Sequence, residues 1–171
     1  MNADDVRVLL DYHYWARDRV LDAVEPLSPE QLTGAMGGSF RCVRDTLVHV
    51  YWAEWLWYWR WQGQPKTIRF DQVVNEFPDV ASLRKAWREH EQLMRAFFDA
   101  LDGDGIKRVI EYKSLAGQPA ASILWHMLQH VVNHASYHRG QVTTLLRQIG
   151  AAPPKSMDLI AFYRERSAPA V

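Results

Sequence analysis

A ladder of four histidines runs through the second half of the chain, each four residues from the next. The ladder lies in a segment whose apolar residues recur every three or four positions, the period of an amphipathic α-helix. Its members are His126, His130, His134 and His138. Residues four apart lie on one helical face with Cβ atoms roughly 5–6 Å apart, so neighbouring imidazoles can share one ion. The segment from about residue 120 to residue 149 is therefore expected to form a long helix carrying these histidines.

The four histidines do not all face the core of the protein. Because a helix turns about 100° per residue, each imidazole can be placed against the centre of the apolar stripe. His138 falls roughly 25° from that centre and His134 roughly 65°. His130 lies on the flank at roughly 105°, and His126 points outward at roughly 145°. The inner pair, His134 and His138, is therefore predicted to face inward.

A metal site built on this pair needs a third ligand from another helix. Two inward imidazoles are as compatible with a metal site as with buried core histidines that each form a hydrogen bond. His49 is the best third candidate, since it lies roughly 70° from the centre of the apolar stripe of its own predicted helix. His13 and His90 lie on the inward stripes of two further helices and are interpreted as core or ligand-supporting residues. Three histidines without a thiolate leave room for water or substrate, as in catalytic metal sites.

Three other segments carry the period of amphipathic helices and complete a predicted all-α four-helix bundle. They are expected at about 3–25, from the candidate N-cap Ser39 to about Gln62, and from Asp79 or Ser82 to about Leu101. A capped helical turn at residues 28–31 precedes the second of them. Residues 66–78 are polar and predict a long irregular connection. A short extended insert at about 108–119 precedes the last long helix, and residues 156–166 predict a brief fifth helix. We expect one domain over residues 1–166 and a loose tail at 167–171.

The composition argues against several classes of protein. Lys+Arg and Asp+Glu both number 20 among the 171 residues, so no net charge is available to gather nucleic acid or an anionic membrane. No run of about 20 uncharged apolar residues predicts a membrane span. The single cysteine, Cys42, suits a reducing compartment, and the first residues lack the order of a signal peptide. We therefore expect a cytoplasmic protein that binds neither nucleic acid nor membrane.

Eleven residues from Tyr51 to Trp61, termed the aromatic stretch, contain seven aromatic side chains. They point all round the predicted helix, so one core is not expected to bury them all. Three interpretations are a core face with a few exposed rings, a dimer interface, and an apolar wall beside the metal. We favour a homodimer interface, with Trp52 or Trp57 lining the pocket. For Arg60 and Glu54, inside the stretch, pairing or capping is an alternative, but such charges are most often simply solvated.

Three segments resemble motifs of the DinB/YfiT-like superfamily. The sequence HVVNHASYHRGQ, from His130 to Gln141, resembles its C-terminal signature. The sequence VRDTLVHVYWAEW, from Val43 to Trp55, resembles its second-helix motif, and YHYWAR, beginning at Tyr12, is similar to its first-helix run. The resemblance implies a four-helix bundle of up-down-down-up topology, usually dimeric, with a metal held by three histidines.

By motif position the implied metal ligands are His49, His134 and His138, which include the inner pair chosen from helical angles. Three imidazoles favour Zn or Ni, and Fe is also compatible. Gly140 matches the motif too, and its missing side chain is expected to let another helix or loop approach closely.

The resemblance implies two classes of function. Some members of the superfamily are thiol-dependent enzymes that use mycothiol, bacillithiol or glutathione as a cosubstrate. We therefore expect a metal-dependent transferase or hydrolase acting on a small molecule, with a low-molecular-weight thiol as its partner. The alternative is a non-enzymatic metal-binding or stress-response bundle. In favour of this alternative, the sequence places no carboxylate beside the ligands to act as a general base.

Overall fold

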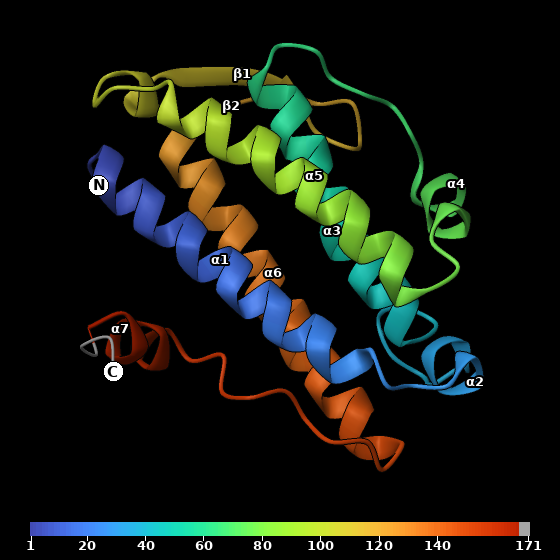
Figure 1. The fold of residues 1–171 in the computed structure, drawn as a ribbon. Helices are drawn as coiled ribbons and strands as arrows, with labels where there is room; N and C mark the ends of the chain where they lie inside the picture. The colour runs from blue at the N-terminus through green and yellow to red at the C-terminus, as the bar shows by residue number, and fades with distance from the viewer. Residues whose placement is uncertain (168–171) are drawn as a thin grey trace.

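Four long helices, one for each predicted amphipathic segment, form the bundle in the computed structural model, which describes residues 1–167 (Figure 1). They are α1 (Ala3–Val24), α3 (Val43–Trp61), α5 (Val80–Asp99) and α6 (Leu124–Gln148). The shorter elements are α2 (Pro29–Thr33), α4 (Phe70–Val73), η1 (Val74–Glu76), η2 (Gly105–Lys107), β1 (Val109–Lys113), β2 (Pro119–Ile123) and α7 (Leu159–Ser167). The predicted helical bundle with an extended insert before its last long helix is confirmed. Residues 168–171 of the predicted tail lie outside the described residues, and Ser167 belongs to α7.

The helices α3 and α5 run in one direction, and α1 and α6 run in the other (Figure 1). This is the up-down-down-up order that the resemblance implies. The 19 residues of α3 span about 28 Å, and the chain must return over that length before α5 begins. Residues 62–79 make this return outside the bundle, and they are not wholly irregular as predicted, because they contain α4 and η1. None of the helices in residues 1–167 is long and apolar enough to cross a membrane.

The start of α3 differs from the sequence prediction. Ser39 is not its N-cap; the helix begins at Val43, and the Cys42 sulfur accepts a hydrogen bond from the backbone N–H of Asp45 at 3.4 Å. The hydroxyl of Ser39 instead accepts a hydrogen bond from the side-chain amide of Gln141 on α6, at 3.0 Å. Ser39 therefore joins the loop before α3 to α6, and Cys42 is the N-cap of α3.

The extended insert is an antiparallel hairpin of β1 and β2. Its register pairs Val109 with Ile123 and Lys113 with Pro119. Gly117 occupies the turn with φ +79°, a conformation that favours glycine. The predicted start of the last long helix near residue 120 is wrong because residues 119–123 are paired with β1, so α6 begins only at Leu124.

Neighbouring elements of the same chain pack against much of the aromatic stretch. Every aromatic ring in it is buried or half-buried. Trp61 packs against Phe98 of α5, and Trp57 packs against Tyr112 of β1 at 5.1 Å between ring centroids. Trp52 donates a hydrogen bond to a backbone carbonyl of the return segment at 3.1 Å. Three neighbouring elements thus share the rings that one core face cannot bury. The homodimer stays a prediction, without an exposed aromatic stretch to support it.

Glu54 is the most buried carboxylate among the described residues, with 1% of its surface exposed. It accepts hydrogen bonds from His13 Nε2 at 2.9 Å, the Tyr14 hydroxyl at 2.7 Å and Trp87 Nε1 at 2.8 Å. The interpretation of Glu54 as a solvated charge is therefore wrong, because α1 and α5 supply three donors in the core. His13 and His90, which lies 3.7 Å from Glu54, are core residues as predicted.

The donors around Glu54 decide its protonation state. Burial opposes ionisation of this carboxyl, but the neighbouring His13 and the hydrogen bonds to His13 and Tyr14 outweigh it and lower its pKa to about 2. Burial lowers the pKa of His13, and the neighbouring Glu54 opposes that shift. The carboxylate and its donors join α3 to α1 and α5.

We expect Glu54→Gln to destabilise the protein by roughly 3 kcal/mol at pH 7, since it removes the charge around which three donors are arranged. The folded-state pKa lies below the ordinary value of 4.5. The stabilisation by Glu54 is therefore full above about pH 4.5 and is lost as the pH falls toward 2. Urea unfolding of both proteins at pH 7, 5 and 3 should give a difference that shrinks at pH 3.

The matched control is Glu89→Gln, which changes an exposed carboxylate on α5 and should alter stability by less than about 0.5 kcal/mol. An equal loss of stability at pH 3 and pH 7 in Glu54→Gln would contradict an ionised Glu54.

Candidate metal centre

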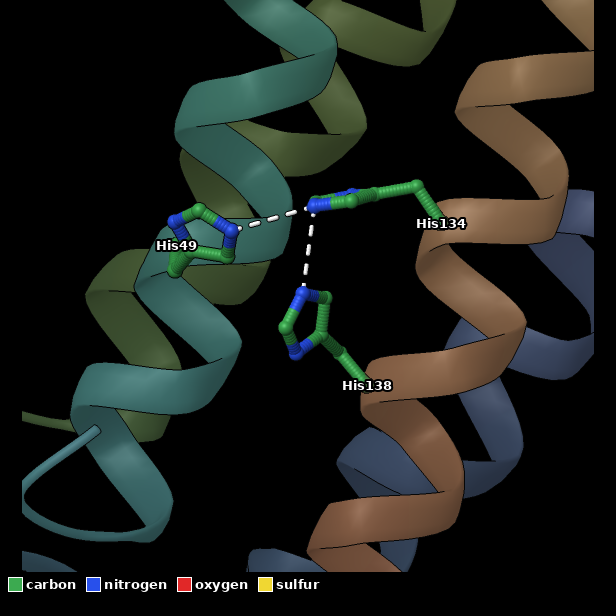
Figure 2. Close-up of side chains that lie close together, drawn as sticks. All are labelled: His49, His134 and His138. Atoms are coloured by element: carbon green, nitrogen blue, oxygen red, sulfur yellow. Dashed lines mark hydrogen bonds between the residues drawn. The ribbon is translucent and has the colours of Figure 1, made fainter. Parts of the chain in front are cut away.

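Three imidazoles converge between α3 and α6, and they are the three that the resemblance implies (Figure 2). His134 Nε2 lies 3.1 Å from His49 Nε2 and 3.1 Å from His138 Nε2. All three ligand atoms lie within 4.8 Å of one another. Nitrogens at about 2.0–2.1 Å from a zinc ion are about 2.9 Å apart at right angles and about 3.4 Å apart in a tetrahedron. The two spacings of 3.1 Å fall between these limits, and the cluster is compatible with a shared divalent cation.

The orientation of His138 is set by a chain of hydrogen bonds. Its Nδ1 lies 2.7 Å from Oε1 of Gln141, and the amide nitrogen of Gln141 donates to the Ser39 hydroxyl. An amide oxygen only accepts hydrogen bonds, so the Nδ1 of His138 carries the proton. With Nδ1 engaged by Gln141, Nε2 is the nitrogen of His138 that faces the cluster. Metal-binding histidines are commonly held in this way by a partner on the other nitrogen.

Hydrogen bonding alone does not satisfy the three nitrogens. His134 Nε2 is equally close to the other two, and one proton on it can be given at full strength to only one neighbour. The remaining nitrogen then has no partner of its own within the cluster. A divalent cation accepts all three lone pairs, so the donor set fits a metal better than it fits a proton.

The histidines are ready to bind a cation at neutral pH. Burial, together with the neighbouring imidazoles, lowers the pKa of His49 to about 3 and that of His134 to about 4. Both side chains are thus neutral at pH 7, and an imidazole must be neutral to ligate a metal.

Aromatic rings form a wall on the His49 side of the cluster. Phe40 stacks on His49 at 4.2 Å between ring centroids, and Phe70 meets it edge-on at 5.8 Å. Trp52 lies 5.9 Å from His49. Phe40 and Phe70 were missed from the sequence because they lie in the loop before α3 and at the start of α4. A lone phenylalanine in a polar segment is the only sequence signal that marks them.

A cavity of about 1420 Å³ lies beside this wall. It is lined by α3, by residues 65–71 and by the hairpin, and Trp52 and Phe70 belong both to its lining and to the wall around His49. The prediction that Trp52 lines a pocket is confirmed. Trp57 does not line this cavity, because its ring packs under Tyr112 and against His130.

The other residues singled out from the sequence do not join the three-histidine cluster. His126 and His130 are exposed, in keeping with the helical angles. Gly140 is exposed as well, and a Cβ built on it meets no atom within 4 Å. The expected close approach of another element at Gly140 is therefore wrong within this chain. No carboxylate joins the three-histidine cluster in residues 1–167, and Glu54 is held in the core.

Comparisons with known proteins agree with the motifs. The sequence profile of the DinB family matches residues 1–166. Protein DinB of Bacillus subtilis (strain 168) is 25% identical over 160 residues, covering 90% of this chain and 92% of that protein. The crystal structure of a DinB-like protein from Bacillus cereus ATCC 10987 is similar with a TM-score of 0.65 and 16% identity, covering 86% of this chain and 95% of that one. At such identity the structural match speaks for the fold alone.

Replacing one ligand should remove the metal and leave the fold. We expect His138→Ala, loaded with Zn or Ni and desalted, to retain almost no metal by elemental analysis while its far-ultraviolet circular dichroism stays helical. Gln141→Ala should weaken metal affinity by about 10–100-fold, since His138 loses its orienting partner. His126→Ala, an exposed histidine on the same helix, is the control and should bind like the wild type. Undiminished metal in His138→Ala would contradict the assignment.

Substituting Gly140 tests the space around it. Gly140→Ala should raise the free energy of unfolding by about 0.5–1 kcal/mol, because alanine favours the helix interior and nothing obstructs its Cβ. Thermal or urea unfolding measures the change. A loss of stability would mean that another molecule packs on this face of α6.

Proposed function

The chain belongs to the DinB family, and from this premise and its three-histidine cluster we propose that it is a metal-dependent enzyme that joins a low-molecular-weight thiol to a small molecule. The observation that carries the proposal is the donor set. Three imidazoles converge, and no carboxylate or thiolate of residues 1–167 completes the group. Catalytic sites keep a coordination position for water or substrate, whereas structural zinc sites are closed by a fourth protein ligand.

The surroundings of the cluster support a catalytic role. His49 and His134 are half-buried, so the cluster is reachable from outside. Trp52 and Phe70 stand between it and a cavity large enough for a small molecule. A divalent cation held by these histidines would lower the pKa of a bound thiol or water.

The residues of the chain itself have defined tasks in this proposal. His49, His134 and His138 would supply the nitrogen ligands, and Gln141 orients the last of them. The rings of Phe40, Phe70 and Trp52 lower the polarity on one side and limit the access of water.

The lack of a general base favours thiol transfer over hydrolysis. Glu54 is engaged by three donors in the core, and no other carboxylate of the described residues joins the cluster. A thiol with an ordinary pKa of about 8.5 needs far less assistance to ionise than water, with a pKa of about 15.7. The same observation is what favours the alternative, a non-enzymatic metal-binding or stress-response bundle. We take the metal to be Zn or Ni, with Fe compatible.

A fluorogenic electrophile tests the proposal. Monochlorobimane gives a fluorescent adduct when a thiolate sulfur displaces its chloride. We expect the metal-loaded protein to accelerate this reaction with at least one of glutathione, bacillithiol and mycothiol. The acceleration should vanish on chelation, return with Zn or Ni, and be absent in His138→Ala but retained in His126→Ala.

If no thiol gives metal-dependent turnover, thiol transfer is contradicted. Metal-dependent cleavage of an activated ester by the same protein would then favour hydrolysis, and bound metal with neither reaction would favour the non-enzymatic bundle.

A further inference from the structure

Arg60 is a half-buried cation that lacks an acidic partner among the described residues. Its guanidinium carbon lies 4.6 Å from the centroid of the Trp57 ring and 5.7 Å from that of Tyr112. No carboxylate of residues 1–167 forms an ion pair with it. Two other shielded arginines, Arg17 and Arg84, each pair with carboxylates. Arg139 of α6 is buried without an ion pair among the described residues, but it does not line the cavity. Arg60 is therefore a charge whose desolvation the chain does not compensate with an anion.

Arg60 lines the cavity that lies beside the aromatic wall of the three-histidine cluster. Trp52, Leu56 and Arg60 recur every four residues along one face of α3, and all three line the cavity. Trp52 marks the end nearest His49, and Arg60 lies eight residues further on, about 12 Å along the helix axis. The floor of the cavity thus runs from an aromatic end beside the histidines to a cationic end beneath the hairpin.

The walls of the cavity add to the positive charge. Its lining contains four cationic and two acidic side chains: Arg60, Lys66, Arg69 and Lys113, with Asp71 and Glu111. Arg69 and Asp71 pair with each other at 3.0 Å. An apolar floor, a cationic surplus and one partly desolvated guanidinium together suit an anion with an apolar body.

We propose that this cavity binds a small organic acid with an apolar body, whose carboxylate or sulfonate pairs with Arg60 while its body lies along Leu56 and Trp52 toward the three-histidine cluster. Arginine is suited to this task because its planar fork holds an acid group with two parallel hydrogen bonds. The inferred binding site depends only on the cavity and its lining residues. Its use as a substrate site rests on the proposed metal-dependent function.

Two dyes with related ring systems test the charge preference. The probe is 8-anilinonaphthalene-1-sulfonate, and the neutral comparison is N-phenyl-1-naphthylamine, which lacks the sulfonate. Both fluoresce in apolar surroundings, so their Kd values follow from titration of the protein. We expect the sulfonate to bind the wild type more tightly. Arg60→Met should raise its Kd about tenfold and change that of the neutral dye less than twofold.

Three further variants test the need for a positive charge at residue 60, the location of the dye in the cavity, and nonspecific binding to exposed cations. Arg60→Lys keeps a cation and should retain most of the preference for the sulfonate. Ala121→Trp fills the cavity from β2 and should weaken both dyes. Arg147→Met removes an exposed cation at the end of α6 and should change neither. An unchanged Kd for the sulfonate in Arg60→Met, or unchanged binding of both dyes in Ala121→Trp, overturns the inference.

The same titrations on chelator-treated protein and on His138→Ala keep this inference apart from the proposed function. Dye binding requires no metal, so preference for the sulfonate without any metal-dependent turnover supports the acid-binding cavity and contradicts the enzyme. Metal-dependent turnover without a preference for the sulfonate contradicts acid binding in the cavity and supports the metal centre.

Discussion

The rotation of α3 about its own axis is the constraint on which the candidate site depends. Glu54 lies five positions after His49, which places it about 140° round the helix. The donors of α1 and α5 hold Glu54 in the core, at 2.7–2.9 Å. Because the Glu54 face of α3 packs against α1 and α5, His49 faces α6, where His134 and His138 lie beside it. The buried carboxylate and the three-histidine cluster are thus consequences of one helix orientation.

The topology supplies the rest of the site. Because α3 and α5 run in the same direction, the return segment must pass along the outside of the bundle (Figure 1). It brings Phe70 against His49 and lines one side of the cavity, while the hairpin before α6 lines another. An antiparallel arrangement with short loops would leave this face of α3 bare. The return segment and the hairpin therefore pack against part of the aromatic stretch and shape the space beside the candidate metal centre.

Helical angles explain both the success and the failures of the sequence predictions. They separate His134 and His138 from the flanking His130 and the outward His126, because the apolar stripe of α6 marks the core side. They do not reveal which neighbours meet a polar side chain. Glu54 looks like a surface charge inside an aromatic run, and only the donors from α1 and α5 make its burial tolerable. Gly140 resembles a contact point, but the face of α6 that carries it is open within this chain.

The apolar periodicity, with the residues that begin and end helices, was enough to assign the four long helices, the insert and the inward pair of histidines. Those features depend on residues near one another in the chain. The third histidine, His49, came mainly from the motif likeness. The stacking of Phe40 on His49, the bond from Gln141 to Ser39 and the cavity that ends at Arg60 join segments far apart in sequence. Such contacts depend on how the helices rotate and pack, so only the tertiary structure decided them.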